Sequence, residues 1–177
     1  MTATLIVQTP GAIVPNANAY LDVAMSDILA AKYGLTAWVD SLLDKTTPLF
    51  VATQYLESTY SGSFRGRLLD PTQPLSFPRT TFYKSNGQIV EQGAIPEELT
   101  LAQLQLAIQS LNGVDLYAPP SQNGNLKRLT EAVEGAVNRT QEWFSPNSST
   151  SNPKYQIGVI LTPILSGSGT GNRTYRA

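Results

Sequence analysis

Three arginines stand close together in the stretch YSGSFRGRLLDPTQPLSFPRT, residues 60–80, which is rich in proline and aromatic side chains. They are Arg65, Arg67 and Arg79. A guanidinium group presents a planar fork of donors that binds carboxylates and phosphates through paired hydrogen bonds. The stretch is therefore a candidate for one of three roles: an active-site loop, a nucleic-acid clamp or a contact between subunits.

Phe77, Pro78 and Arg79 combine an apolar anchor, a fixed turn and a fork-shaped donor. In a first interpretation, Phe77 fills a place in its own core and Arg79 binds a helix C-terminus or a carboxylate of the same chain. In a second, Arg65, Arg67 and Arg79 reach the acidic surface of a neighbouring copy. The candidate acidic residues are Asp40, Asp44, Glu97 and Glu98. A direct contact with phosphate is the third interpretation.

The composition removes most catalytic chemistry. The 177 residues include no histidine and no cysteine, which excludes imidazole acid–base catalysis, thiolate nucleophiles and zinc sites built on these ligands. The acidic pairs Asp22/Asp27 and Glu131/Glu134 fit helix caps and solvated surface better than a metal site. No phosphate-binding loop, dinucleotide fingerprint or nucleophile elbow occurs. We therefore expect no enzyme, no metal and no cofactor.

The charges are nearly balanced, with 12 basic and 13 acidic residues, but they alternate in blocks. Residues 1–60 carry two positive and five negative groups, 61–90 four and one, 91–120 none and four, and 121–177 six and three, which gives −3, +3, −4 and +3. Such alternation suits head-to-tail contacts between copies. A protein that grips DNA through its phosphates would show a clear basic excess.

The elements that must position these residues are mainly helical. Apolar spacing and end signals predict helices at 22–33, 47–60 and 96–111, with one or two helical turns at 37–43. A β-hairpin is expected at 82–90, because Asn-Gly favours a tight type I′ turn. We expect Thr47 to cap the second helix. The apolar face of the first helix consists of Leu21, Met25, Ile28 and Leu29, and the residues off the apolar face of the third are Gln103, Gln105 and Gln109.

Four segments are expected along the chain. Residues 1–18 form an extended N-terminal lead, and 19–117 form the helical core with its hairpin near 82–90. Residues 118–144 are a short β or mixed segment, interpreted as two short strands, although the apolar spacing from 126 to 137 also fits a helix. Residues 145–177 are a flexible arm whose apolar part, 155–165, docks either on its own core or on another chain. No stretch is apolar and long enough for a membrane span.

Six short motifs follow one another in order. They are Asn18-Ala19-Tyr20-Leu21-Asp22-Val23-Ala24, Trp38, Ala52-Thr53-Gln54-Tyr55-Leu56, Arg65-Gly66-Arg67, Gln73-Pro74-Leu75-Ser76-Phe77-Pro78-Arg79 and Ile95-Pro96. This order resembles a family of tailed-bacteriophage virion proteins, often labelled "DnaT-like single-stranded DNA-binding protein", that are similar to helical head-tail adaptor (connector) proteins. The resemblance covers about residues 16–113. It departs at Phe77, where tryptophan is usual, and at Pro74, where a small residue is usual.

The resemblance implies a structural virion protein. It would form a ring, a dodecamer, beneath the portal, join the capsid to the tail, and let packaged double-stranded DNA pass through its lumen without specific binding. Its partners would be other copies of itself, the portal protein and a tail or nozzle protein, with no membrane. It would be made in the host bacterial cytoplasm and reside at the head-tail interface of the virion. The alternatives are a single-stranded DNA-binding replication protein and another neck or tail-terminator ring protein.

Two sets of residues would carry these contacts. The subunit or partner interface would consist of Arg65, Arg67, Phe77, Pro78 and Arg79 together with Asp40, Asp44, Glu97 and Glu98. The portal-docking arm would consist of Tyr155, Ile157, Val159, Ile160, Leu161, Ile164 and Leu165.

Overall fold

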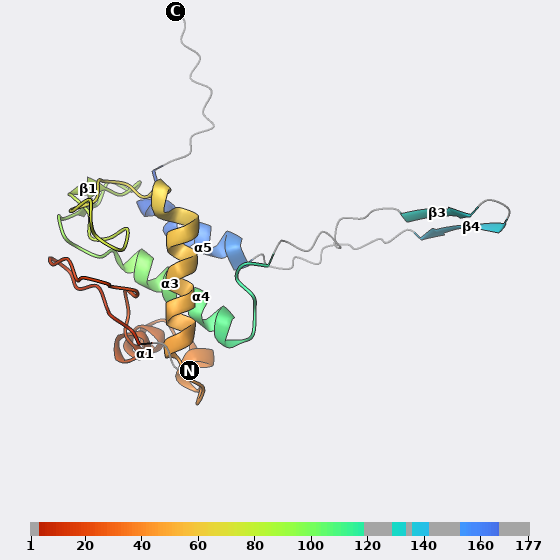
Figure 1. Ribbon diagram of the computed structural model, residues 1–177, viewed down its shortest axis with the longest axis horizontal. Coiled ribbons are helices and arrows are strands. Elements are labelled where there is room, and N and C mark those ends of the chain that lie inside the picture. Colours follow the sequence, from red (N-terminus) through yellow and green to blue (C-terminus); the bar gives the residue numbers. More distant parts are fainter. Residues whose placement is uncertain (1–3, 119–128, 134–135, 142–152, 167–177) are drawn as a thin grey trace, which may run out of the picture. The chain divides into compact units, whose positions relative to one another are not determined.

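The computed structural model describes residues 4–118, 129–133, 136–141 and 153–166. The chain divides into two compact units, one made of Met1–Leu116 with Pro153–Ala177 and the other of Tyr117–Asn152. The fold is mainly helical with a small antiparallel hairpin (Figure 1), which confirms the expected fold class. Within the described residues, no helix combines the length and apolar character that crossing a membrane would require.

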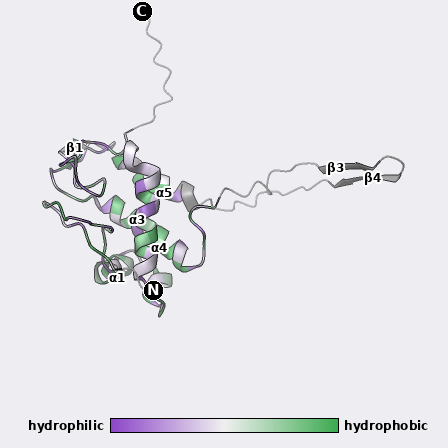
Figure 2. Cartoon of the chain, in the orientation of Figure 1, coloured by the Kyte–Doolittle hydropathy of each residue, from purple (hydrophilic) through white to green (hydrophobic). Residues whose placement is uncertain are grey.

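Two long helices form the centre of the first unit. They are α3 (Thr46–Tyr60) and α4 (Glu97–Leu111), and they pack extensively on each other. Figure 2 shows hydrophobic residues along α4. The fully buried aliphatic side chains at the centre are Leu49, Leu56, Leu99 and Leu104. Since burying one such side chain contributes about 2 kcal/mol, this contact is a major source of stability for the unit.

The first helix, α1 (Val23–Lys32), begins and ends as its sequence predicts. The Asp22 carboxylate accepts a hydrogen bond from the amide of Met25 at 2.6 Å, which caps the helix. Gly34 follows the last turn with φ of +66°, a left-handed conformation that glycine adopts without steric cost. A short helix, α2 (Thr36–Val39), comes directly after it.

The face that α1 buries differs from the prediction. Ser26 and Ala30 are the fully buried residues of this helix, whereas Ile28 is 72% exposed and Met25 about half exposed. Of the predicted apolar face, Leu21 is buried and Leu29 packs against the core, whereas Met25 and Ile28 are turned toward solvent. The first unit therefore presents apolar side chains on its surface near α1 and α2.

The start of α3 also differs from the prediction. The helix begins at Thr46, and Thr47 lies inside its first turn instead of capping it. The side chain that binds the first residue of the helix is Asp44. Its carboxylate accepts hydrogen bonds from the Thr46 amide at 3.0 Å and from the Thr46 hydroxyl at 2.6 Å. These hydrogen bonds lower the pKa of Asp44, the hydroxyl contact contributing most.

The predicted hairpin is present, with β1 (Phe82–Tyr83) paired antiparallel to β2 (Ile89–Val90). The turn is not of type I′, because Gly87 has φ of +84° but Asn86 has no positive φ. The amide of Gly87 donates to the carbonyl of Lys84 at 3.0 Å, and the amide of Lys84 to the carbonyl of Gln88 at 2.8 Å. This is a longer connection in which a single left-handed glycine closes the loop.

The apolar C-terminal segment packs on its own chain. It forms a helix, α5 (Pro153–Leu161), followed by a single 3-10 turn, η3 (Thr162–Ile164), instead of an extended arm. The helix lies against α4, and Ile157, Leu161 and Ile164 are completely buried. Of the two alternatives for this segment, docking on its own core is therefore correct.

Backbone hydrogen bonds fasten the end of this segment. The amide of Arg65 donates to the carbonyl of Ile164 at 2.9 Å, and the amide of Ser166 donates to the carbonyl of Ser63 at 2.7 Å. Ile160 and Leu165 are partly buried, and Val159 is exposed. Tyr155 lies in the first turn of α5, and its side chain is outside the described part of the chain. These residues do not form a free docking arm.

The second unit contains two strands, β3 (Leu129–Val133) and β4 (Ala136–Gln141). They pair antiparallel with Thr130 opposite Thr140 and Glu131 opposite Arg139. Both strands lie within residues 118–144, the segment predicted to be β or mixed.

We predict that Leu161→Ala lowers the free energy of unfolding by about 2–5 kcal/mol, because it leaves a cavity where α5 meets the core. Val159→Ala, in the same helix but 54% exposed, should change it by less than about 0.5 kcal/mol. Urea titrations of the full chain measure both values. Equal stability of the two variants would show that α5 is not part of the folded core.

Candidate functional site

Arg79 is buried, with 7% of its surface exposed, and its guanidinium binds backbone carbonyls of its own chain. The acceptors are the carbonyl oxygens of Ser76 at 2.9 Å, Phe64 at 2.8 Å, Gly66 at 2.8 Å, Arg65 at 3.2 Å and Ser61 at 3.3 Å. Ser61 ends α3 and opens the 3-10 turn η1 (Ser61–Ser63). One side chain thus gathers the carbonyls that follow the C-terminus of α3, where a positive charge is favoured by the helix dipole.

The loop bends around this guanidinium at Gly66. Gly66 has φ of +76°, and a Cβ placed on it would lie 3.0 Å from the carbonyl oxygen of Thr80 and 3.1 Å from the ring of Phe82. Only glycine fits this position without displacing its neighbours. Burial lowers the pKa of Arg79 from its usual value, although an arginine keeps its charge in proteins.

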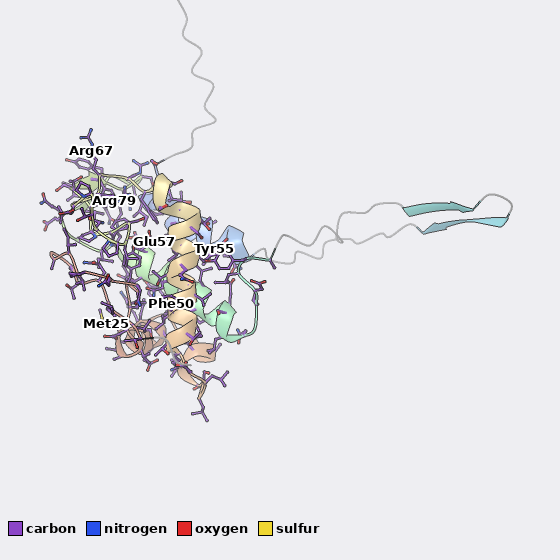
Figure 3. The ribbon with its side chains drawn as sticks, in the orientation of Figure 1. Met25, Phe50, Tyr55, Glu57, Arg67 and Arg79 are labelled. Atoms are coloured by element: carbon purple, nitrogen blue, oxygen red, sulfur yellow. The ribbon has the colours of Figure 1, made fainter. Side chains whose placement is uncertain are left out.

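A second set of polar contacts joins α3 to the same loop. The Glu57 carboxylate accepts hydrogen bonds from the hydroxyl of Tyr20 and from the amide and hydroxyl of Ser76, the latter two at 3.1 and 2.6 Å. The amide of Phe77 donates to the Tyr20 hydroxyl at 3.3 Å. Burial, and secondarily the charge of Glu57, raises the pKa of Tyr20 well above its usual value. Figure 3 shows Glu57 on α3 with Arg79 beyond it toward the end of that helix.

Gln103 extends these contacts into the core. This residue of α4 is completely buried, contrary to the expectation that it lies off the packed face. Its amide nitrogen donates to the Thr53 hydroxyl at 2.8 Å and to the Leu49 carbonyl at 3.2 Å, and its oxygen accepts from the amide of Tyr20 at 3.2 Å. Sequence analysis missed Glu57 and Gln103, because a periodicity pattern scores polar residues as surface.

Phe77 is completely buried beside these groups. Its ring packs against Phe64 with centroids 5.2 Å apart and against Phe82 at 6.2 Å, and the Arg79 guanidinium lies 5.6 Å from its centroid. Pro78, joined to Phe77 by a cis peptide bond, is buried as well. The own-chain interpretation matches this geometry, because Phe77, Pro78 and Arg79 are buried in their own core and are not a surface for another chain.

The other two arginines behave differently from Arg79. The Nε of Arg65 donates to the Leu165 carbonyl at 2.8 Å, and one of its terminal nitrogens lies 3.5 Å from the Tyr83 carbonyl oxygen. Arg65 therefore helps hold the C-terminal segment. Arg67 is exposed, its guanidinium has no partner among the described residues, and Figure 3 shows it at the periphery of the first unit.

Two of the four predicted acidic residues are paired within the chain. Glu97 binds Lys32 and accepts a hydrogen bond from the Tyr33 hydroxyl at 2.7 Å, and these contacts, that of Lys32 first, lower its pKa. Glu98 binds Lys84 at 2.6 Å. Both carboxylates therefore pair with cations of their own chain. This weakens the expectation that they bind arginines of a neighbouring copy.

Asp40 and Asp44 remain on the surface. Both are exposed, and the Asp40 side chain has no partner in the described part of the chain. Between them, Leu42 is fully exposed and Leu43 is 65% exposed. We call this segment, residues 40–44, the acidic end. Isolated exposed leucines are ordinary, but two adjacent ones flanked by carboxylates are typical of a protein contact.

The acidic end and Arg67 lie at opposite ends of α3. Residues 40–44 immediately precede this 15-residue helix, whose length is about 22 Å, and Arg67 follows it. Figure 3 shows Arg67 at the end of α3 opposite Met25 and Phe50. Leu68, next to Arg67, is 40% exposed. We call residues 67–68 the basic end, since it offers a cation and an apolar side chain where the acidic end offers anions and leucines.

The lysines whose side chains the structure describes are engaged internally. Lys32 forms an ion pair with Glu97, Lys45 with Asp27 at 2.8 Å, and Lys84 with Glu98. Within the described ranges, no cluster of acidic residues could hold a metal ion. These three lysines therefore offer little free positive charge to a polyanion.

We predict that Arg79→Lys lowers the free energy of unfolding by about 3 kcal/mol or more, because a lysine ammonium cannot reach five carbonyls and leaves several buried and unpaired. Arg67→Lys, at an exposed position, is the matched control and should change it by less than about 0.5 kcal/mol. Chemical denaturation followed by circular dichroism measures both. The assignment of Arg79 fails if the two variants are equally stable.

The comparisons with known proteins agree with the motif order. The sequence model of one family, described as "Putative DnaT-like ssDNA binding protein", matches residues 3–177. No curated protein and no solved structure matches the chain. Because the match spans nearly the whole sequence, this chain belongs to the family with that description.

Proposed function

We propose that the protein is a head-tail adaptor of a tailed bacteriophage, a ring of identical copies that joins the portal vertex of the capsid to the tail. The motif order from residue 16 to 113, which resembles that of head-tail adaptors, supports this proposal. The single observation that carries it is the polarity of the first unit, which holds the acidic end and the basic end at opposite ends of α3.

Polarity of this kind favours a closed ring. A surface at one end that complements a different surface at the other produces head-to-tail contacts, and such contacts close into a ring when the rotation between copies allows it. Opposite charges steer the two ends together and select against like ends. The exposed Leu42 and Leu43 would supply the apolar area that charged pairs on a surface do not.

The rigid loop behind the basic end suits a mechanical part. Arg67 follows directly after the carbonyls that Arg79 binds, so its backbone is fixed by a buried anchor. Arg65 ties the same loop to η3. A subunit contact held by such a loop keeps its geometry when force acts on it. A ring through which DNA passes would need this property.

Passage of DNA requires a lumen without strong binding. Lys32, Lys45 and Lys84 are neutralised by carboxylates of the same chain, and the net charge of the whole sequence is −1. Tight nucleic-acid binding depends on many unpaired cations that displace counterions from phosphates. The scarcity of unpaired cations therefore suits a lumen through which DNA passes without binding.

The alternative function is the one in the family description, binding of single-stranded DNA. Proteins of that kind combine a positively charged groove with aromatic side chains on which bases stack. In the described part of the chain, Tyr33 and Tyr83 are exposed, but the lysines nearest to them in sequence, Lys32 and Lys84, are paired with carboxylates. We therefore favour the adaptor. Another neck or tail-terminator ring would use the same contacts at a different place in the particle.

We predict that Arg67→Glu lowers the yield of particles with joined heads and tails about tenfold, because it turns an attraction in every subunit contact into a repulsion. Asp40→Lys should do the same, and the exchange Arg67→Glu with Asp40→Lys should restore the yield. Asp40 is preferable to Asp44, which caps α3. The readout is electron microscopy of particles complemented with each variant.

The matched control is Glu91→Lys at another exposed position, which makes the same change in charge as Asp40→Lys and a change of equal size and opposite sign to Arg67→Glu. It should leave the yield unchanged. The head-to-tail contact is ruled out if Arg67→Glu behaves like this control, or if the exchanged pair is no better than either single variant.

A further inference from the structure

The β3–β4 hairpin is an incomplete sheet. It belongs to the second unit, and in the described part of the chain the sheet has only these two strands. A two-stranded hairpin is at best marginally stable in water, whereas three or more strands with a partner surface are stable. A further strand would therefore stabilise the hairpin.

Each strand of the hairpin has one edge that the other strand does not cover. In an antiparallel pair, alternate residues direct their amide and carbonyl groups outward, and these groups can pair with a further strand. Such edges are sites of strand addition by another chain. Both edges of the β3–β4 sheet offer this backbone pattern.

The charges on the two strands are complementary. Glu131 is the only charged residue among the five of β3, and Arg139 is the only charged residue among the six of β4. The register places them opposite each other within the hairpin. If β3 of one copy pairs with β4 of the next in the same register, Glu131 also stands opposite Arg139 of the neighbouring copy. Two β3 edges or two β4 edges would bring like charges together, which is destabilising.

Ring symmetry gives the strands the required direction. Copies related by rotation about one axis hold their hairpins in the same orientation, so β4 of one copy runs opposite to β3 of the next. This is the antiparallel arrangement that already exists within each hairpin. A complete turn of the ring would use every edge, and closure is the way in which sheets eliminate free edges.

We propose that the β3 edge of each copy pairs with the β4 edge of the adjacent copy, so that the hairpins form one continuous antiparallel sheet around the ring. The occupant of each edge is a second copy of this chain, selected by charge and by symmetry. This inference rests on the proposed ring and adds to it a second contact between subunits, independent of the one at the ends of α3.

The absence of cysteine allows a direct test with the full-length chain. Thr130→Cys and Thr140→Cys are made as separate variants, which leaves Glu131 and Arg139 intact, and are mixed and treated with a short bis-maleimide. We expect a mixed dimer of the two variants to exceed either homodimer about fivefold, the factor that a like-charge penalty of about 1 kcal/mol gives. Excess homodimer, or no cross-link, would overturn the proposal.

Two further variants separate charge from hairpin formation. Because Thr130 and Thr140 face each other, the double variant Thr130→Cys/Thr140→Cys should cross-link within one chain, which verifies the hairpin. Exchanging the pair, Glu131→Arg with Arg139→Glu, in the Thr130→Cys chain alone keeps opposite charges within each hairpin and should remove the excess of mixed dimer. The same exchange in both chains should restore it. If the exchange in one chain has no effect, charge does not select the edge and the proposal fails.

The outcome is distinguishable from failure of the proposed function. Cross-linking reports on the purified chain in solution and does not depend on where the protein lies in a particle. A mixed dimer formed by a chain that is missing from particles would support the edge pairing and contradict the adaptor. Joined particles that depend on Arg67, without any mixed dimer, would support the adaptor and contradict the edge pairing.

Discussion

The guanidinium of Arg79 is the interaction on which the rest of the first unit depends. It binds five carbonyl oxygens between Ser61 and Ser76. Phe64 and Ser76 are buried, and a buried carbonyl left without a donor costs about 1–3 kcal/mol. These carbonyls belong to the segment that leaves α3 and to the loop that returns toward β1. A buried cation with no carboxylate in direct contact is unusual. Here the carbonyl dipoles replace the carboxylate, because they converge on one point.

This anchor explains why most of the motif residues are internal. Tyr20, Glu57 and Ser76 hold the loop to α3, Gly66 gives it the bend, and Gln103 joins α4 to α3 and to Tyr20. A fully satisfied polar network of this kind favours a single arrangement of the fold. The exposed residues that we propose as contacts are free of that constraint.

The sequence predicted the elements that depend on local signals and missed those that depend on tertiary packing. Asp22 marks the start of α1 through its side chain, and Gly34 marks its end through its positive φ. Apolar spacing predicted the two long helices at 47–60 and 96–111. Burial of Gln103 was not predictable, because its three hydrogen bonds come from residues far away in the chain. The exposure of Ile28 depends on which face of α1 meets the core. Nor could periodicity decide between the core and another chain as the partner of α5.

The central claim is that this chain acts through contacts with other copies of itself in a particle. Cryo-electron microscopy of the assembled virion tests it most directly, since the side chains around Arg79 would identify the chain in a map. The account predicts a closed ring directly beneath the portal, with the acidic end of each copy against the basic end of the next. Density at another place in the particle, or particles that lack the chain altogether, would contradict it.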